Sequence, residues 1–128
     1  MILDDFLLTR YERGARGPSA YDCWGLVRAA RCVLFGRPEL PSLTGVEPGD
    51  FPAITMAFRE LSASLSVARP HPGAIASAFI GKFCVHGGLC VELDGRTFIL
   101  ETDEKTGPAL TAQRVFESRY LRVVYHDD

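Results

Sequence analysis

The sequence predicts an α+β domain that spans residues 1–128. Apolar residues recur at helical spacing in the first half of the chain, whereas segments rich in β-branched and aromatic residues follow from Ala74 onward. A chain of this length can bury one core of its own. Its content of 47% hydrophobic and 23% charged residues is typical of globular proteins. Helices first and strands second predict helices packed on an antiparallel sheet.

Two helices are expected before residue 40. The segment ILDDFLLTRY carries its apolar residues at the spacing of a short amphipathic helix. After a Gly- and Arg-bearing loop, Asp22 is a suitable N-cap for a second helix, which Gly36 and Pro38 close. The apolar positions of this helix are Leu26, Val27, Ala30, Val33 and Leu34.

An irregular loop and a third helix are expected in the middle of the chain. Residues 37–53, together with Gly36 before them, contain four prolines and three glycines, which indicates a loop that crosses the molecule. A third helix is expected from about Ile54 to Val67.

Four strands are expected in the second half, with the sequences AIASAFI, CVHGGLCVEL, RTFIL and YLRVVYH. Asp94-Gly95 between two of them predicts a two-residue hairpin turn. In that register His86 faces Asp103 and lies diagonal to Glu101. Val85 and Leu89 share one face of the strand, so His86 is expected on the face opposite the apolar one.

Charge and hydropathy argue against two classes of partner. The formal net charge is −2, which gives no field to recruit nucleic acid or an anionic membrane. The apolar runs are far shorter than the roughly 20 residues that span a bilayer, so no membrane insertion is expected. The start MILDDFLL lacks the basic region of a secretion signal. The four cysteines are expected to be free, as in a protein made in the cytosol.

Cys23 is the candidate nucleophile. It stands directly after the expected N-cap, where the helix dipole and free backbone N–H groups stabilise a thiolate. The alternative is a buried cysteine that only fills space. Cys32, two and a half turns along the same helix, is expected to be a packing residue.

His86 is the candidate general base, because His71 lies between two prolines and His126 near the C-terminus. Either Glu101 or Asp103 can orient its imidazole in the predicted register. The alternative is an exposed histidine beside surface acids.

Metal and phosphate sites are not expected. Cys84, His86 and Cys90 lie on one strand and match no paired zinc motif, so neither a metal nor another cofactor is predicted. The run RGARG lacks the lysine and the preceding strand of a phosphate-binding loop. It is interpreted as the border of a substrate groove.

Two blocks resemble a known family. The segment YERGARGPSAYDCWGLVRAARCVLFGRPELP is similar to the N-terminal half of NlpC-type cysteine peptidases, and most of all to their tailed-phage versions. The segment VHGGLCVELDGRTFILE resembles the second block of that family. The resemblance implies a papain-like NlpC-type fold.

The resemblance also implies roles for individual residues. Cys23 would be the nucleophile and His86 the general base, while Glu101 occupies the place where the family usually has His, Asn or Gln. Ala74 stands where the family usually has Asp. Tyr11 and Asp22 fall at positions near the substrate. Trp24, the third residue assigned to substrate binding, lies inside the first turn, which predicts that it packs the helix against the sheet.

The implied function is hydrolysis of amide bonds in the peptide stem of bacterial peptidoglycan by a cysteine peptidase. Its setting would be a phage tail that acts at the bacterial cell envelope after synthesis in the host cytoplasm, with other tail proteins as partners. Two alternatives remain: a catalytically degenerate structural or assembly protein of the tail, and a thiol-dependent amidase or acyltransferase with a substrate outside the cell wall.

Overall fold

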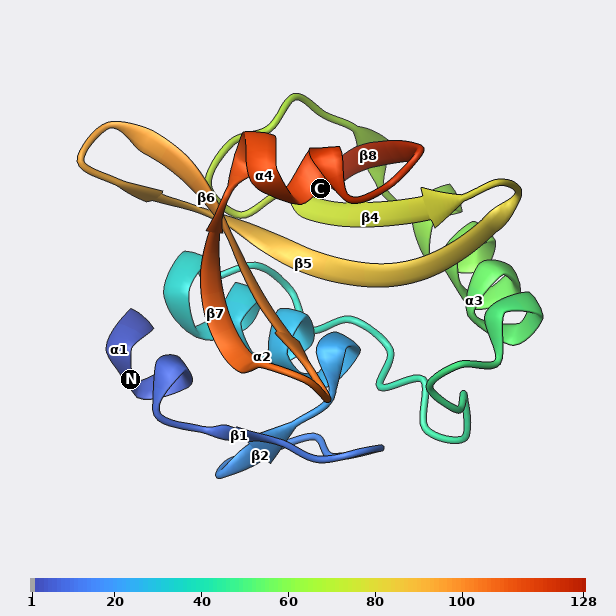
Figure 1. Ribbon diagram of the computed structural model, residues 1–128, viewed down its shortest axis with the longest axis horizontal. Helices are drawn as coiled ribbons and strands as arrows, with labels where there is room; N and C mark the ends of the chain where they lie inside the picture. The colour runs from blue at the N-terminus through green and yellow to red at the C-terminus, as the bar shows by residue number, and fades with distance from the viewer. Residues whose placement is uncertain (1) are drawn as a thin grey trace.

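The α+β class is confirmed by a computed structural model that describes residues 2–128 (Figure 1). The helices within these residues are α1 (Leu3–Leu7), α2 (Cys23–Phe35), α3 (Phe51–Ala63) and α4 (Gln113–Ser118). None of them combines the length and the apolar content that crossing a bilayer requires.

The strands form a six-stranded antiparallel sheet and a short parallel pair. The order in the sheet is β3-β8-β4-β5-β6-β7. Its members are β3 (Ser66–Val67), β4 (Ile75–Ile80), β5 (Phe83–Leu93), β6 (Arg96–Asp103), β7 (Gly107–Ala112) and β8 (Arg122–Asp127). The parallel pair is β1 (Arg10–Tyr11) with β2 (Ala20–Tyr21).

Helix α2 begins and ends as the sequence predicts. The Asp22 side chain accepts a hydrogen bond of 2.8 Å from the Gly25 N–H, which satisfies one of the free amides of the first turn. Gly36 ends the helix with φ of 63°, a left-handed conformation that glycine adopts without steric cost.

The bounds predicted for the third helix are wrong. Helix α3 begins at Phe51, because Asp50 caps it and Pro52 fits the first turn, where its missing N–H costs no hydrogen bond. The irregular loop therefore ends three residues earlier than expected. The helix stops at Ala63, and Ser66–Val67 instead form β3, which pairs with β8.

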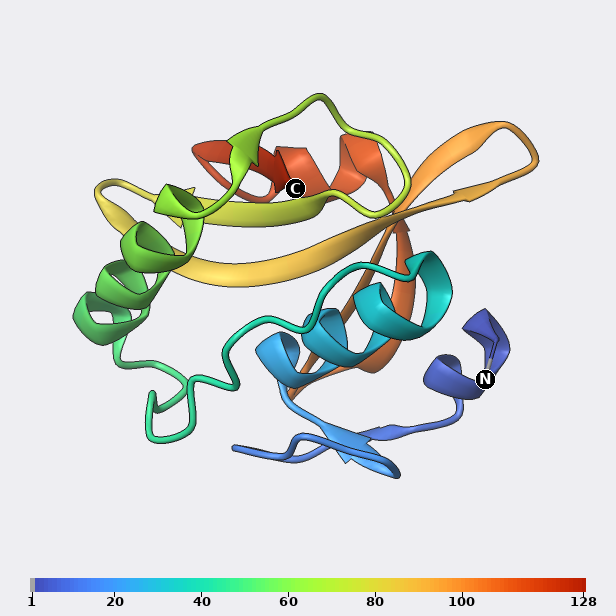
Figure 2. The ribbon, with the colours of Figure 1, turned by 180° about the vertical axis from the view of Figure 1, so that it is seen from behind.

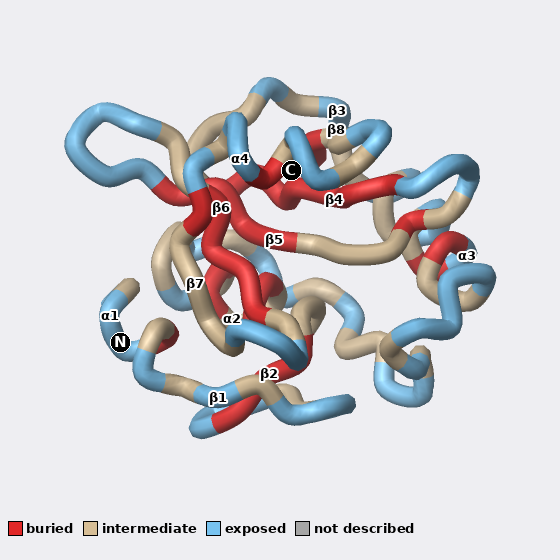
Figure 3. The backbone as a smooth tube through the Cα atoms, in the orientation of Figure 1, coloured by how far each residue is buried: buried red, intermediate tan, exposed pale blue. Residues whose placement is uncertain are grey.

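The hairpin at Asp94-Gly95 is confirmed. Both residues have positive φ, 52° and 75°, as a type I′ turn requires. The predicted register holds from Leu93 opposite Arg96 to Leu89 opposite Leu100. The hairpin tip projects from the body of the molecule and is exposed (Figure 3).

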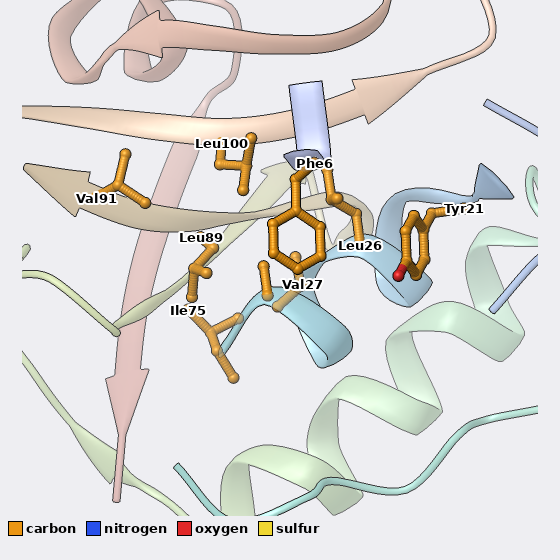
Figure 4. Packing of buried hydrophobic residues seen from close by; sticks show 9 residues of the cluster. Phe6, Tyr21, Leu26, Val27, Ile75, Leu89, Val91 and Leu100 are labelled. Atoms are coloured by element: carbon orange, nitrogen blue, oxygen red, sulfur yellow. The ribbon is translucent and has the colours of Figure 1, made fainter. Parts of the chain in front are cut away.

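Two core clusters lie on opposite faces of the sheet. One cluster joins Leu26 and Val27 of α2 to Leu89 and Leu100 of the sheet (Figure 4). The other packs Phe116 of α4 against alternate residues of the same strands; these are Ala76, Ala78, Cys90 and Ile99. His86 lies on the face opposite Leu89, as expected, but that face also packs against apolar side chains, so β5 has two covered faces instead of one.

The unexpected cover comes from α4, and neither α4 nor the edge strand β7 before it was predicted from the sequence. The β7 segment GPALTA contains glycine, proline and two alanines, all weak strand formers. Helix α4 has six residues and sits between β7 and β8, so the order of helices first and strands second does not hold throughout (Figures 1 and 2).

A buried charge cluster fixes the C-terminal strand to α2. Arg31 is 1% exposed and donates hydrogen bonds of 2.6 Å to Asp127 and 3.1 Å to the Gly73 carbonyl. Arg37 and His71 bind the other Asp127 oxygen at 2.8 and 2.7 Å. His71 belongs to this cluster and therefore contributes to the stability of the fold.

Candidate active site

Cys23 is the first residue of α2 and is half-buried. The turn before it is held on both sides: the Arg16 Nη1 group donates to Asp22 at 2.7 Å, and the Asp22 N–H donates to the Ala15 carbonyl at 3.1 Å. A Cβ atom at Gly25 would lie 2.4 Å from that carbonyl oxygen, so glycine is required for this close approach. The thiol is thus presented from a rigid strand-to-helix turn.

His86 lies on β5 at the point where β5 and β6 separate. The pairing of the two strands ends at Leu89 opposite Leu100, and α2 contacts both strands in the angle between them (Figures 1 and 2). Only 11% of the His86 side chain is exposed. Its ring packs on Tyr120 and Phe116, with centroid distances of 6.3 and 6.0 Å.

Glu101 holds the imidazole across the gap between the strands. The His86 Nε2 atom lies 2.9 Å from one carboxylate oxygen of Glu101. The other oxygen accepts hydrogen bonds from Thr111 Oγ1 at 2.5 Å and Arg119 Nη1 at 2.9 Å. Glu101 is 3% exposed, so β6, β7 and the residue after α4 meet around one buried carboxylate.

Asp103 does not take this role, and its expected pairing opposite His86 is not formed. Its carboxylate accepts hydrogen bonds from the Lys105 and Thr106 amides at 2.8 and 2.9 Å, which closes the turn between β6 and β7. The ladder between β5 and β6 ends before this position because the strands have already separated. Of the two carboxylates considered, Glu101 is the one in contact with His86.

The site favours an imidazolium. Burial lowers the pKa of His86, but hydrogen bonds and the negative charges of Cys23 and Glu101 outweigh burial and raise this pKa to about 10. For Glu101, burial raises the pKa, and the hydrogen bonds from His86 and Thr111 together with nearby positive charge bring it below its ordinary value. Near neutral pH the histidine is therefore positively charged.

Cys23 and His86 line the same cavity, and Cys23 is one of the two residues that raise the pKa of His86. Because Nε2 faces Glu101, the other ring nitrogen, Nδ1, is left for the thiol. Tyr11 is also near: burial raises the pKa of its hydroxyl, and the charges of Cys23 and Asp22 raise it further. The structure thus brings Cys23, His86, Glu101 and Tyr11 together.

Asp22 and Trp24 stabilise the start of α2, which carries Cys23. The Asp22 carboxylate is buried and occupied by Gly25 and Arg16, so in this structure it shapes the start of α2. The Trp24 indole N–H donates to the Pro41 carbonyl at 2.9 Å, which ties the crossing loop to the helix. Its ring packs against the core, as expected, and also lines a cavity beside Cys23.

The other thiols differ in their environments. Burial raises the pKa of Cys84 to about 11 and that of Cys90 to about 12, so both are protonated near neutral pH. Cys32 is half-buried on α2, and all four cysteines are free.

Four functional neighbours were not predicted from the sequence: Thr111, Phe116, Arg119 and Tyr120. They lie on β7, on α4 and just after it. The run QRVFESRY has a polar and aromatic alternation that is compatible with a short helix, but no spacing in it points to His86.

Comparisons with known proteins give no assignment. No protein-family model matches the chain, and no curated protein matches it. Within residues 2–128, no group of three or more His, Cys, Asp or Glu side chains is arranged to hold a metal ion. The interpretation of the site therefore rests on its geometry and on the sequence.

Proposed function

We propose that the chain is a cysteine hydrolase that cleaves an amide bond through a thioester on Cys23. The observation that carries the proposal is the position of Cys23 at the start of α2, beside a buried imidazolium that Glu101 holds in place. An imidazolium next to a thiol at a helix start stabilises the thiolate, which is the nucleophilic form.

The first half of the reaction forms the thioester. The Cys23 thiolate attacks the carbonyl carbon, and the oxyanion is stabilised by the amides of Cys23 and Trp24. These amides belong to the first turn of α2, where backbone N–H groups have no partner inside the helix. When the C–N bond breaks, His86 gives its proton to the leaving amine.

The second half releases the acid. Neutral His86 takes a proton from water as the water attacks the thioester, and the C–S bond breaks to restore the thiolate. In the acyl-enzyme the negative charge of Cys23 is gone, and with it one of the two influences that raise the pKa of His86. Glu101 still raises the pKa of His86. A higher pH therefore increases the fraction of His86 that is neutral and able to take a proton from water.

The resemblance of the Cys23 and His86 blocks to NlpC-type peptidases supplies the finer part of the proposal. It assigns a papain-like NlpC-type fold, the peptide stem of peptidoglycan as the substrate, and a phage tail as the setting. A half-buried Cys23 beside the buried His86 in an α+β domain is compatible with that assignment.

Digestion of isolated sacculi tests the proposal. Purified chain should release fragments that carry new amino termini, identified by mass spectrometry, across a pH series from 6 to 10. Cys23→Ala should release none while retaining the far-UV circular dichroism of the wild type. Absence of new amino termini at every pH would refute the wall-peptidase assignment.

One observation favours a second candidate, a non-catalytic tail component. His86, Glu101, Thr111 and Arg119 form a satisfied buried polar network that ties together β5, β6, β7 and the segment after α4, and such a network stabilises a fold without catalysis. An assembly protein would keep this network, but Cys23 would be acylated by an activated ester no faster than a free thiol such as N-acetylcysteine.

A further inference from the structure

A cavity of about 90 Å³ opens beside Cys23 and His86. Its walls come from α3, the crossing loop and β5, and the thiol and the imidazole lie at its edge. Most of the side chains that line it are apolar, among them Leu43, Val46, Ile54, Phe58, Leu61 and Val85.

Each charged side chain that lines this cavity has a partner of opposite charge. Arg16 is paired with Asp22 at 2.7 Å, Glu47 with Arg13 at 3.3 Å, and the His86 imidazolium with Glu101 at 2.9 Å. Within residues 2–128, the cavity therefore presents no cation that is free of an acidic partner. Burying a carboxylate against these apolar walls would cost its hydration without a new ion pair.

We propose that this cavity binds the acyl side of the substrate and selects an uncharged, apolar acyl group. The inference rests on the proposed function and deepens it, because it names the substrate class of the same site. The cavity adjoins the attacking sulfur, so the group attached to the scissile carbonyl would enter it. A deep apolar pocket with few polar groups is the usual form of a site for such a group.

Acylation by p-nitrophenyl esters measures this preference. The Cys23 thiolate forms an S–C bond with the ester carbonyl, the C–O bond breaks, and p-nitrophenolate leaves. Rates for acetyl, butyryl and hexanoyl esters are divided by the rates of free N-acetylcysteine, which removes intrinsic reactivity. Burial of each added methylene predicts an increase of about fourfold until the cavity is full.

Two further sets of esters test whether the acyl group comes from a peptide or from a lipid. Esters of N-acetyl-leucine and N-acetyl-glutamate represent peptide substrates, whereas the hexanoyl ester represents a lipid-type chain. A peptide source predicts that the leucyl ester is the fastest of all, and a lipid source that the hexanoyl ester is. In both cases the glutamyl ester should be the slowest.

Variants connect the preference to the cavity. Val46→Lys places a positive charge in the wall and should lower the hexanoyl-to-acetyl rate ratio at least tenfold. The matched control is Val67→Lys on β3, where the side chain is 83% exposed and lies outside the cavity. This variant should keep the wild-type ratio.

The outcomes separate the cavity from the nucleophile. If Cys23 is acylated at rates independent of chain length, the inference is overturned while the nucleophile stands. If no ester acylates Cys23, the proposed function fails, and binding of hexanamide then decides the cavity by NMR. Shifts of α3 and crossing-loop amides with hexanamide but not acetamide support the inference, and their absence overturns it.

Discussion

Replacing Glu101 with glutamine should lower the pKa of His86 while leaving the ring in place. Glutamine keeps the shape and one hydrogen-bond acceptor, but removes the negative charge that lies 2.9 Å from Nε2. A hydrogen bond to a charged group contributes about 1–2 kcal/mol more than a neutral one. At 1.36 kcal/mol for each pKa unit, the pKa of His86 should fall by about 0.7 to 1.5 from its value of about 10.

The measurement is an NMR titration of the imidazole signals, in protein labelled at histidine. The chain has three histidines, so His86→Gln identifies the signal of interest. Asp103→Asn is the matched control, because Asp103 is a carboxylate on the same strand whose oxygens bind the turn amides. It should change the pKa of His86 much less than Glu101→Gln does.

A double variant separates the two negative partners of His86. Cys23→Ala should also lower the pKa of His86, since the Cys23 hydrogen bond and charge both raise it. The double variant should bring this pKa nearer to the ordinary value of 6.5 or below it, because burial then acts against fewer opposing charges. If His86 titrates in Glu101→Gln where it does in the wild type, the carboxylate does not control the imidazole and the reasoning is refuted.

The same pair makes stability depend on pH in a defined direction. The pKa of His86 is raised in the folded state, so its contribution is fully present below about 6.5 and is lost as the pH rises through about 10. The difference in unfolding free energy between the wild type and His86→Gln should therefore shrink between these values. Urea unfolding at pH 6, 8 and 10 measures it, and a difference that grows with pH would contradict the assignment.

Three further changes test other parts of the structure. With limiting iodoacetamide at neutral pH, Cys23 should be alkylated before the buried thiols, and His86→Ala should slow that reaction, as peptide mass mapping will show. Asp127→Asn should lower the unfolding free energy by about 3 kcal/mol, because the buried Arg31 charge then keeps only the Asp128 carboxylate, which lies at 2.9 Å and is 40% exposed. Burial raises the pKa of Asp127 but its ion pairs lower it further, so this contribution is present above about 3.8 and is lost as the pH falls. Gly88→Ala should lower the thermal midpoint measured by circular dichroism, since its Cβ would lie 2.3 Å from a β6 side chain.

The centre of the candidate site was predictable because local signals fix it. Asp22 and Gly36 define α2, and with it the place of Cys23 in the first turn. The Asp94-Gly95 turn fixes a register in which His86 and Glu101 fall near each other. Each signal acts over a few residues, and the two-residue repeat of a strand carries the information along β5 and β6.

The register alone does not show which of Glu101 and Asp103 contacts His86, because it does not show where the pairing of β5 and β6 ends. The strands separate beyond Leu89, so the residue directly opposite in the extrapolated ladder is not the one in contact. The separation belongs to the tertiary structure: β6 stays paired with β7 from Phe98 to Asp103, whereas its pairing with β5 stops at Leu100. A hairpin turn in the sequence predicts the register of two strands but not the residue at which their pairing ends.

The four neighbours that were not predicted from the sequence hold the imidazole of His86 in place. Thr111 and Arg119 occupy the second oxygen of Glu101, so the carboxylate cannot turn away from His86 without breaking two hydrogen bonds. Phe116 and Tyr120 pack on the imidazole itself and fix its plane. A histidine held on one nitrogen and on its ring has only its other nitrogen left to face the thiol. The short helix α4 and the strand before it, both weak in sequence pattern, therefore orient the imidazole of His86 toward Cys23.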